Sequence, residues 1–123
     1  MERRDVGEAG LHAQAVLVGG HRTIYVSGQV AADDDGNPIG ADVGAQATAA
    51  FERIARFLAE YGASMDDVVK ITTFLVDMDD SASFSAVRAR FFPRRKPASS
   101  TVAVRALSRP EFRIEIEAVA AVG

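Results

Sequence analysis

Apolar and polar residues alternate near the N-terminus in a way that is typical of strands. Residues 13–18 and 23–30 are short runs rich in β-branched side chains, and each predicts one β-strand. The segment Gly19-Gly20-His21-Arg22 between them has the composition of a tight turn. We therefore expect these two strands to pair with each other as a β-hairpin.

Residues 43–61 predict an amphipathic helix, because their apolar positions recur every three or four residues. Asp42 stands where a helix N-cap belongs, and Gly62 stands where a left-handed glycine would end the helix. The apolar positions are Val43, Ala47, Ala50, Phe51, Ile54, Phe57, Leu58 and Tyr61.

Residues 68–76 are almost continuously apolar and β-branched, which is typical of a strand covered on both faces. Lys70 interrupts this run, and we expect a carboxylate to neutralise it, since a buried unpaired lysine is costly. A second helix follows, capped by Asp79 or Asp80 and ended at the residue before Pro93.

Residues 99–107 and 112–122 predict two final strands, joined by a turn at Ser108-Arg109-Pro110. The resulting order, ββ-α-β-α-ββ, indicates one α+β domain with two helices packed on one face of a mixed sheet. The other face of that sheet has no cover within the chain. An uncovered apolar face favours an oligomer.

The composition fits a single globular domain of 123 residues, with 48% apolar residues, 25% charged residues and a net charge of −3. The absence of cysteine excludes disulfides, thiolate ligands and a cysteine nucleophile, and it fits a cytoplasmic protein. No apolar run approaches the roughly 20 residues needed to span a bilayer. The charged start, Met1 to Asp5, does not continue into a signal peptide, so no membrane partner is expected.

Nucleic-acid binding, metal binding and cofactor binding are not predicted. The one dense basic run, which includes Arg88, Arg90 and residues 94–96, fits a helix end and a solvated loop better than a phosphate-binding stripe. The two histidines lie in different local contexts, and the acidic turn 33–35 lacks the ligand spacing of a calcium loop. No glycine-rich phosphate loop is present.

Two glutamates, Glu115 and Glu117, lie in the last predicted strand. Period-two geometry places both on one face of that strand, with Ile114 and Ile116 on the other. A strand with one solvated face explains this pattern without any catalysis. We expect Glu117 to be structural and to pair with Arg113, four residues earlier on the same face.

Four motifs in this order and spacing closely resemble the Rid family of reactive-intermediate deaminases, over residues 10–120. They are Tyr25-Val26-Ser27-Gly28-Gln29-Val30, the run 68–74, Pro97-Ala98-Ser99-Ser100-Thr101 and the ending 114–120. The resemblance implies a chorismate-mutase-like fold and a homotrimer. It also implies that a small-molecule ligand binds in clefts between neighbouring subunits.

The resemblance also implies several site residues. Glu115 matches the glutamate that orients or activates the attacking water, and a partly desolvated carboxylate can act as general acid or base. Ser27 and Gly28 match a motif that lines the cleft, as contacts rather than nucleophiles. His12 replaces a cleft tyrosine, and it would bring a proton shuttle if it enters the cleft; a surface histidine is the equal alternative.

Two substrate-binding positions depart from the family pattern. Ser99 replaces the arginine that holds the substrate carboxylate, and Ser85 replaces a helix asparagine. A hydroxyl offers neither the charge nor the forked geometry of a guanidinium, so these serines favour a neutral or hydroxyl-bearing ligand. Arg88 could swing toward the cleft as a substitute cation, as could Arg94, Arg95 and Lys96 in the following loop, although solvated side chains are the default.

The sequence therefore predicts a hydrolase of a small reactive imine or enamine, not the usual 2-iminopropanoate-type carboxylate. The alternative is a non-catalytic trimer that binds a small molecule or a protein partner in the same clefts, a hypothesis that the altered positions favour. Retention of Glu115 favours the enzyme. The acidic balance argues against a ribonuclease, and chorismate mutase activity would need a cationic clamp that the sequence does not display.

Overall fold

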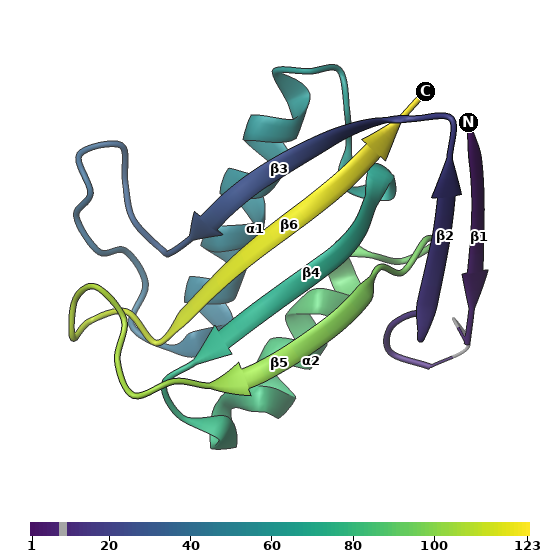
Figure 1. Ribbon diagram of the computed structural model, residues 1–123. Helices are drawn as coiled ribbons and strands as arrows, with labels where there is room; N and C mark the ends of the chain where they lie inside the picture. The colour runs from purple at the N-terminus through teal and green to yellow at the C-terminus, as the bar shows by residue number, and fades with distance from the viewer. Residues whose placement is uncertain (8–9) are drawn as a thin grey trace.

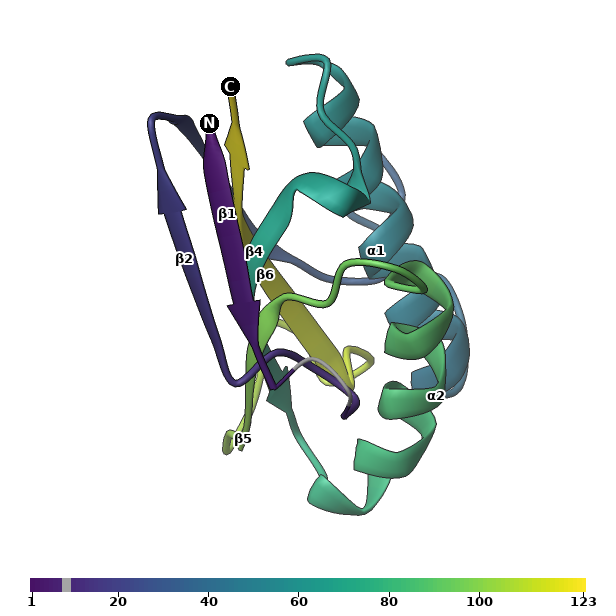
Figure 2. The same ribbon diagram turned by 90° about the vertical axis from the view of Figure 1, so that its right-hand side faces the viewer.

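Two helices cover one face of a four-stranded sheet in the computed structural model, which describes residues 1–7 and 10–123 (Figures 1 and 2). The sheet order is β3-β6-β4-β5, with β4 and β5 parallel and the other pairs antiparallel. This confirms the predicted α+β arrangement with both helices on one side. The elements are β1 (Glu2–Val6), β2 (Ala15–Gly19), β3 (Arg22–Gln29), α1 (Val43–Ala59), β4 (Val68–Leu75), α2 (Ser81–Phe91), β5 (Ala98–Ala103) and β6 (Ile114–Val122), with 3-10 turns at Met65–Asp67 and Met78–Asp80.

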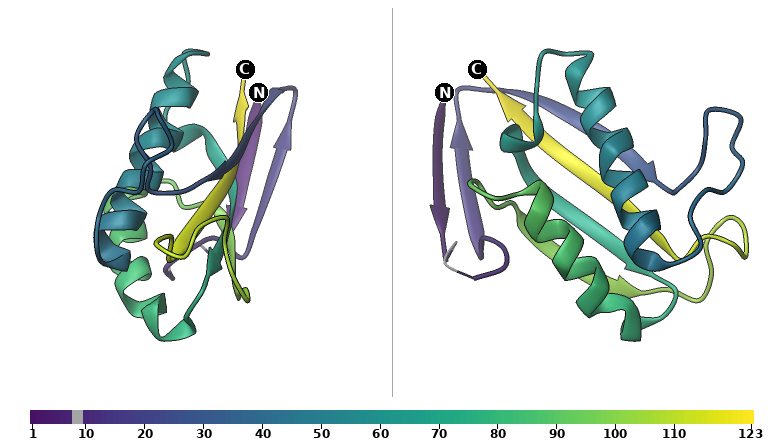
Figure 3. Two further views of the ribbon diagram at one scale, coloured as in Figure 1. Left: turned by 90° about the vertical axis from the view of Figure 1, so that its left-hand side faces the viewer. Right: turned by 180° about the vertical axis from the view of Figure 1, so that it is seen from behind.

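The predicted N-terminal hairpin is wrong. β2 pairs with β1, a strand that the sequence did not predict, while β3 pairs with β6. Arg3 explains why so charged a segment forms a strand: its almost fully buried side chain pairs with Asp5 at 2.9 Å. It also donates to the backbone carbonyl oxygens of Asp66 and Lys96. These contacts fasten the small β1-β2 sheet beside the main one (Figure 3).

The last two strands are also not neighbours. β5 ends at Ala103, β6 begins at Ile114, and β4 lies between them in the sheet. The reason is that α2 forms a crossover, which returns the chain parallel to β4 at the sheet edge. The residues around Ser108 therefore form a long connection rather than a hairpin turn.

The predicted caps of α1 are confirmed. The Asp42 carboxylate accepts a 2.8 Å hydrogen bond from the Ala45 amide, and Gly62 has a φ of 71°, a conformation that favours glycine. Asp80 stands at the N-cap of α2, as expected, but its side chain makes no capping bond. Its carboxylate accepts two bonds from Arg113 at 3.0 and 3.1 Å, so the predicted pairing of Arg113 with Glu117 is wrong.

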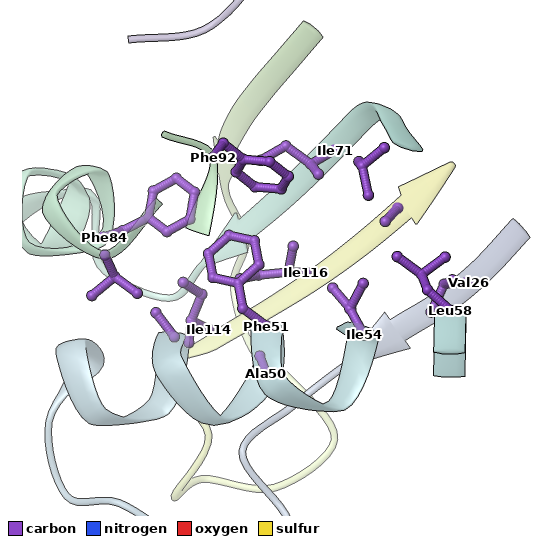
Figure 4. Close-up of a cluster of buried hydrophobic side chains, with 14 of the residues drawn as sticks. Val26, Ala50, Phe51, Ile54, Leu58, Ile71, Phe84, Phe92, Ile114 and Ile116 are labelled. Atoms are coloured by element: carbon purple, nitrogen blue, oxygen red, sulfur yellow. The ribbon is translucent and has the colours of Figure 1, made fainter. Parts of the chain in front are cut away.

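The core lies between the helices and the sheet and is centred on Phe51 of α1 (Figure 4). The Phe51 ring centroid lies 5.0 Å from that of Phe91, 5.6 Å from that of Phe92 and 6.2 Å from that of Phe84. Below them lie the buried aliphatic side chains of the sheet. These include Ile71, Leu75, Ile114, Ile116 and Ala118.

The sheet face opposite the helices, here called the open face, is covered by no helix among the described residues (Figure 2). β4 is therefore buried on one face only, and the prediction of a strand covered on both faces is wrong for the single chain. Lys70 points to this open face and donates to the Ser100 hydroxyl at 2.9 Å instead of meeting a carboxylate. Because the side chain is only partly buried, water can solvate its charge. Within the described residues, neither helix has the length and apolar character to cross a membrane.

Replacing Phe51 with alanine should lower the free energy of unfolding by about 3 to 5 kcal/mol, because a fully buried aromatic side chain leaves a cavity. Phe57→Ala on the same helix is the matched control, since Phe57 is only partly buried, and it should cost clearly less. Urea denaturation followed by circular dichroism measures both variants. Equal losses would contradict this description of the core.

Candidate functional site

The Ser27-Gly28 segment forms a β-bulge in β3. Val26 pairs with Ala118 and Gln29 pairs with Ile116, so two residues of β3 stand opposite the single residue Glu117 of β6. A bulge interrupts the ladder locally and redirects the side chains beside it. The bulge thereby brings Gly28 against Glu115, two residues before Glu117 on β6.

The Glu115 carboxyl group lies directly over Gly28. A Cβ atom built on Gly28 would lie 2.7 Å from the Glu115 Cδ and closer still to its Oε2, so no other residue fits without displacing the carboxylate. Glu115 is half-buried and lies on the open face. The structure thus brings together three of the predicted site residues: Ser27, Gly28 and Glu115.

Two residues that the sequence analysis did not single out hold this bulge. The Gln29 side-chain amide donates to the Ser27 carbonyl oxygen at 3.0 Å, and its own oxygen accepts from Arg53 Nε at 3.1 Å. Arg53 also donates to the Ala32 carbonyl oxygen at 2.9 Å. Gln29 belongs to the Ser-Gly-Gln motif and could have been found there. Arg53 lies on α1, 24 positions after Gln29, and nothing in the sequence around it indicates this contact.

A third such residue, Gln46, fixes the chain that leads into β6. Its buried amide nitrogen donates to the Glu111 carbonyl oxygen at 2.8 Å, and its oxygen accepts from the Arg113 amide at 2.8 Å. These bonds set the start of the strand two residues before Glu115. Gln46 appeared in the sequence as a polar residue within an apolar helix face.

The other predicted substrate-binding residues meet between α2 and β5. Arg88 donates through one terminal nitrogen to the Ser99 hydroxyl at 3.0 Å and through the other to the Ser85 hydroxyl at 3.4 Å. Ser85 and Arg88 share one face of α2 because they are three residues apart. Ser99 is the register partner of the buried Ile71, so it lies on the helix-covered side of the sheet.

Arg88 is a buried cation. Its relative exposure is 5%, and no carboxylate of the described chain lies within ion-pair distance of its guanidinium. Its Nε is buried without a hydrogen-bond partner, and its Cζ lies 5.1 Å from the centre of the Phe84 ring. Burial lowers the pKa of Arg88 from its ordinary value, because the charged form loses its hydration.

His12 lies on a segment that runs beside the start of β5. The Ala13 amide donates to the Pro97 carbonyl oxygen at 3.0 Å, and Ala13 forms an isolated bridge with Ala98. His12 itself is half-buried, with Nδ1 enclosed and without a partner. Its Nε2 lies 3.4 Å from the Gln14 side-chain nitrogen. The residue after His12 thus lies beside Pro97 and Ala98, which directly precede Ser99. The role of His12 as a proton shuttle stays a prediction.

The remaining candidate cations are engaged elsewhere or exposed. Arg94 pairs with Asp66, and Lys96 donates to the Gly10 carbonyl oxygen at 2.8 Å. Arg95 is exposed. Of the cations considered, Arg88 is the one that the structure places against Ser99.

A single chain does not unite these two groups of residues. Glu115 is the register partner of Phe74 on the open face, whereas Ser99 is the partner of Ile71 on the helix-covered face. Side chains on opposite faces of a sheet cannot share one ligand. A hollow of about 290 Å³ between β3 and α1 contains Ser27, but neither Glu115 nor Arg88 lines it.

Replacing Gly28 with alanine should destabilise the protein by about 1 to 3 kcal/mol, because the new methyl group overlaps the Glu115 carboxylate. In a Glu115→Ala background the same change should cost less than about 0.5 kcal/mol, since the overlap is then gone. A double-mutant cycle of urea denaturation curves measures this coupling. Additive effects would show that Gly28 and Glu115 do not touch.

Comparison with known proteins gives these features a family context. The family model described as endoribonuclease L-PSP matches residues 6–122. The chain is 36% identical over 118 residues to a human protein named 2-iminobutanoate/2-iminopropanoate deaminase, covering 95% of this chain and 84% of that one. It is also 36% identical to the mitochondrial protein MMF1 of Saccharomyces cerevisiae, over 79% of this chain and 66% of MMF1. Because that relative is mitochondrial, the expected cytoplasmic location stays a prediction.

Solved structures support the same relationship. The crystal structure of YyfB, a conserved Rid-family protein of unknown function from Yersinia pestis, superposes with a TM-score of 0.89 and 30% identity, covering 99% of this chain and all of that one. A Mycobacterium tuberculosis member of the YjgF/YER057c/UK114 family superposes with a TM-score of 0.75 and 31% identity, over 98% of this chain and 100% of that chain. The chain belongs to the Rid family and has its fold, as its four sequence motifs predicted.

Proposed function

We propose that this protein hydrolyses a small imine, or the enamine in equilibrium with it, to a carbonyl compound and ammonia. The observation that carries the proposal is the Glu115 carboxylate, held over a bulged glycine on the uncovered face of the sheet. A carboxylate in this position can activate water at a bound ligand. The name of the human relative, an imine deaminase, supports the same reaction class.

The chemistry needs one water molecule and no external oxidant or reductant. Water adds to the carbon of the protonated C=N bond while Glu115 accepts one of the water protons, which gives a neutral tetrahedral carbinolamine. Glu115 then returns this proton to the amine nitrogen, the C–N bond breaks, and ammonia leaves. As the carbonyl forms, the hydroxyl oxygen gives up its remaining proton to the Glu115 carboxylate, which passes it to the departing ammonia as ammonium. The Gln29–Arg53 contacts hold the bulge that faces the carboxylate, and a site that is ordered beforehand reduces the entropy lost in reaching the reactive geometry.

We further propose that the working form is a homotrimer with the ligand bound between subunits. The two groups of site residues lie on opposite faces of one sheet, so a cleft that contains both needs a second copy of the chain. The open face also exposes Tyr25 at 80% and Val102 at 43%, and packing of copies would cover them. A closed ring of identical copies satisfies both requirements.

A second candidate is a non-catalytic trimer that binds a small molecule or a protein partner in the same clefts. The observation that favours it is the loss of the family arginine and asparagine, with Ser99 and Ser85 in their places. The two candidates differ in whether Glu115 catalyses a reaction of the bound ligand.

Glu115→Gln should lower the rate of imine hydrolysis at least about 100-fold, because the amide cannot accept the water proton. Glu117→Gln is the matched control: it removes a carboxylate from the same face of the same strand and should keep the rate within about threefold. Imines are generated in situ by an amino-acid oxidase, and their loss is followed by competition with semicarbazide trapping. Equal rates for wild type and Glu115→Gln would contradict the proposal, and a wild type without turnover on any imine would favour the binding protein.

A further inference from the structure

Arg88 is a charge without a counter-charge. Arg88 as a whole residue is only 5% exposed, so its guanidinium has lost part of its hydration, and no carboxylate in the described part of the chain compensates it. Buried charges are ordinarily paired, because an unpaired charge loses its hydration without compensation. The contact with the Phe84 ring and two neutral hydroxyls offsets only part of that cost. An anion from outside the chain would complete the site.

Ser85 and Ser99 provide the route to this charge. Each hydroxyl oxygen accepts a hydrogen bond from a different terminal nitrogen of Arg88, so each O–H proton remains available to a further acceptor. Both serines are half-buried, so they can be reached where the guanidinium cannot. A hydroxyl that accepts from a cation becomes a stronger donor, because hydrogen bonds in series polarise one another.

We propose that the Ser85 and Ser99 hydroxyls bind a carboxylate of the ligand, with the Arg88 charge directly behind them. This deepens the proposed function and rests on it, since it assigns a 2-imino carboxylate as the substrate class. Two donors set side by side by one planar guanidinium match the two oxygens of a carboxylate.

The site revises the expectation that Ser99 favours a neutral ligand. That expectation assumed that the cation is lost with the strand arginine. Arg88, eleven residues earlier in the chain, supplies the charge from α2 instead. Because the Ser99 side chain is small, the Arg88 guanidinium has room beside it. Arg88 acts here as a positioning residue, because the serines and not the guanidinium touch the ligand.

The test compares the binding of 2-oxobutanoate, an anion, with that of its neutral methyl ester, by NMR titration of the wild-type protein. Wild type should bind the anion at least tenfold more tightly than the ester. Arg88→Gln should lose that preference through weaker anion binding, with ester binding unchanged, and Arg88→Lys should keep part of it. The double variant Ser85→Ala/Ser99→Ala should lose it as well. Anion binding by Arg88→Gln as tight as that of wild type would overturn the proposal.

Two controls separate this inference from the proposed function. Glu117→Gln should bind 2-oxobutanoate like wild type, because Glu117 is exposed and is not among the residues assigned to the site. If anion binding depends on Arg88 but no imine is hydrolysed, the anion site stands and the catalytic proposal fails. If imines are hydrolysed and Arg88→Gln has an unchanged KM, the anion site fails alone. Arg88→Gln should unfold at a temperature no lower than wild type, since it removes an unpaired buried charge.

Discussion

The alternation of side chains along β6 is the constraint on which the rest of the molecule depends. Ile114, Ile116 and Ala118 face the helices and close the core, so Glu115 must face the other way. A shift of one residue in register would bury the glutamate and expose the isoleucines. The Gln46 amide, bonded to Glu111 and Arg113, sets that register at the start of the strand, so the position of the carboxylate is determined by the packing of the core.

The bulge and the buried arginine are two further consequences of the same sheet. On the open face, the register shift between Val26 and Gln29 presents a residue without a side chain to Glu115. On the helix-covered face, the small Ser99 side chain admits a guanidinium from α2. In the proposed trimer, the open face of one copy contributes the Glu115 carboxylate to the cleft. The helix-covered face of a neighbouring copy contributes the Ser85 and Ser99 hydroxyls, with the Arg88 charge behind them.

The sequence predicted the features that depend on neighbours along the chain, and it failed where distant segments meet. The Asp42 cap, the left-handed Gly62 and the inward face of residues 114–118 follow from local spacing and are confirmed. The pairing of β2 with β1 does not, because the strand β1 depends on Arg3 reaching the carbonyl oxygens of Asp66 and Lys96. The sequence indicated only that Arg88 could swing toward the cleft. Its contact with Ser99 depends on the crossing of α2 over β5, which local spacing does not encode.

Subunit complementation tests the central claim, a site shared between copies, most directly. Glu115→Gln and Arg88→Gln are each expected to be impaired, in different halves of the cleft. The two variants are unfolded, mixed in equal amounts and refolded together. In every trimer that contains both variants, one of the three junctions between neighbouring subunits should have an intact Glu115 carboxylate and an intact Arg88. Activity at low substrate concentration should rise to about a quarter of the wild-type value, from the share of such junctions in a closed ring of three. Activity equal to the mean of the separate variants would contradict a shared site.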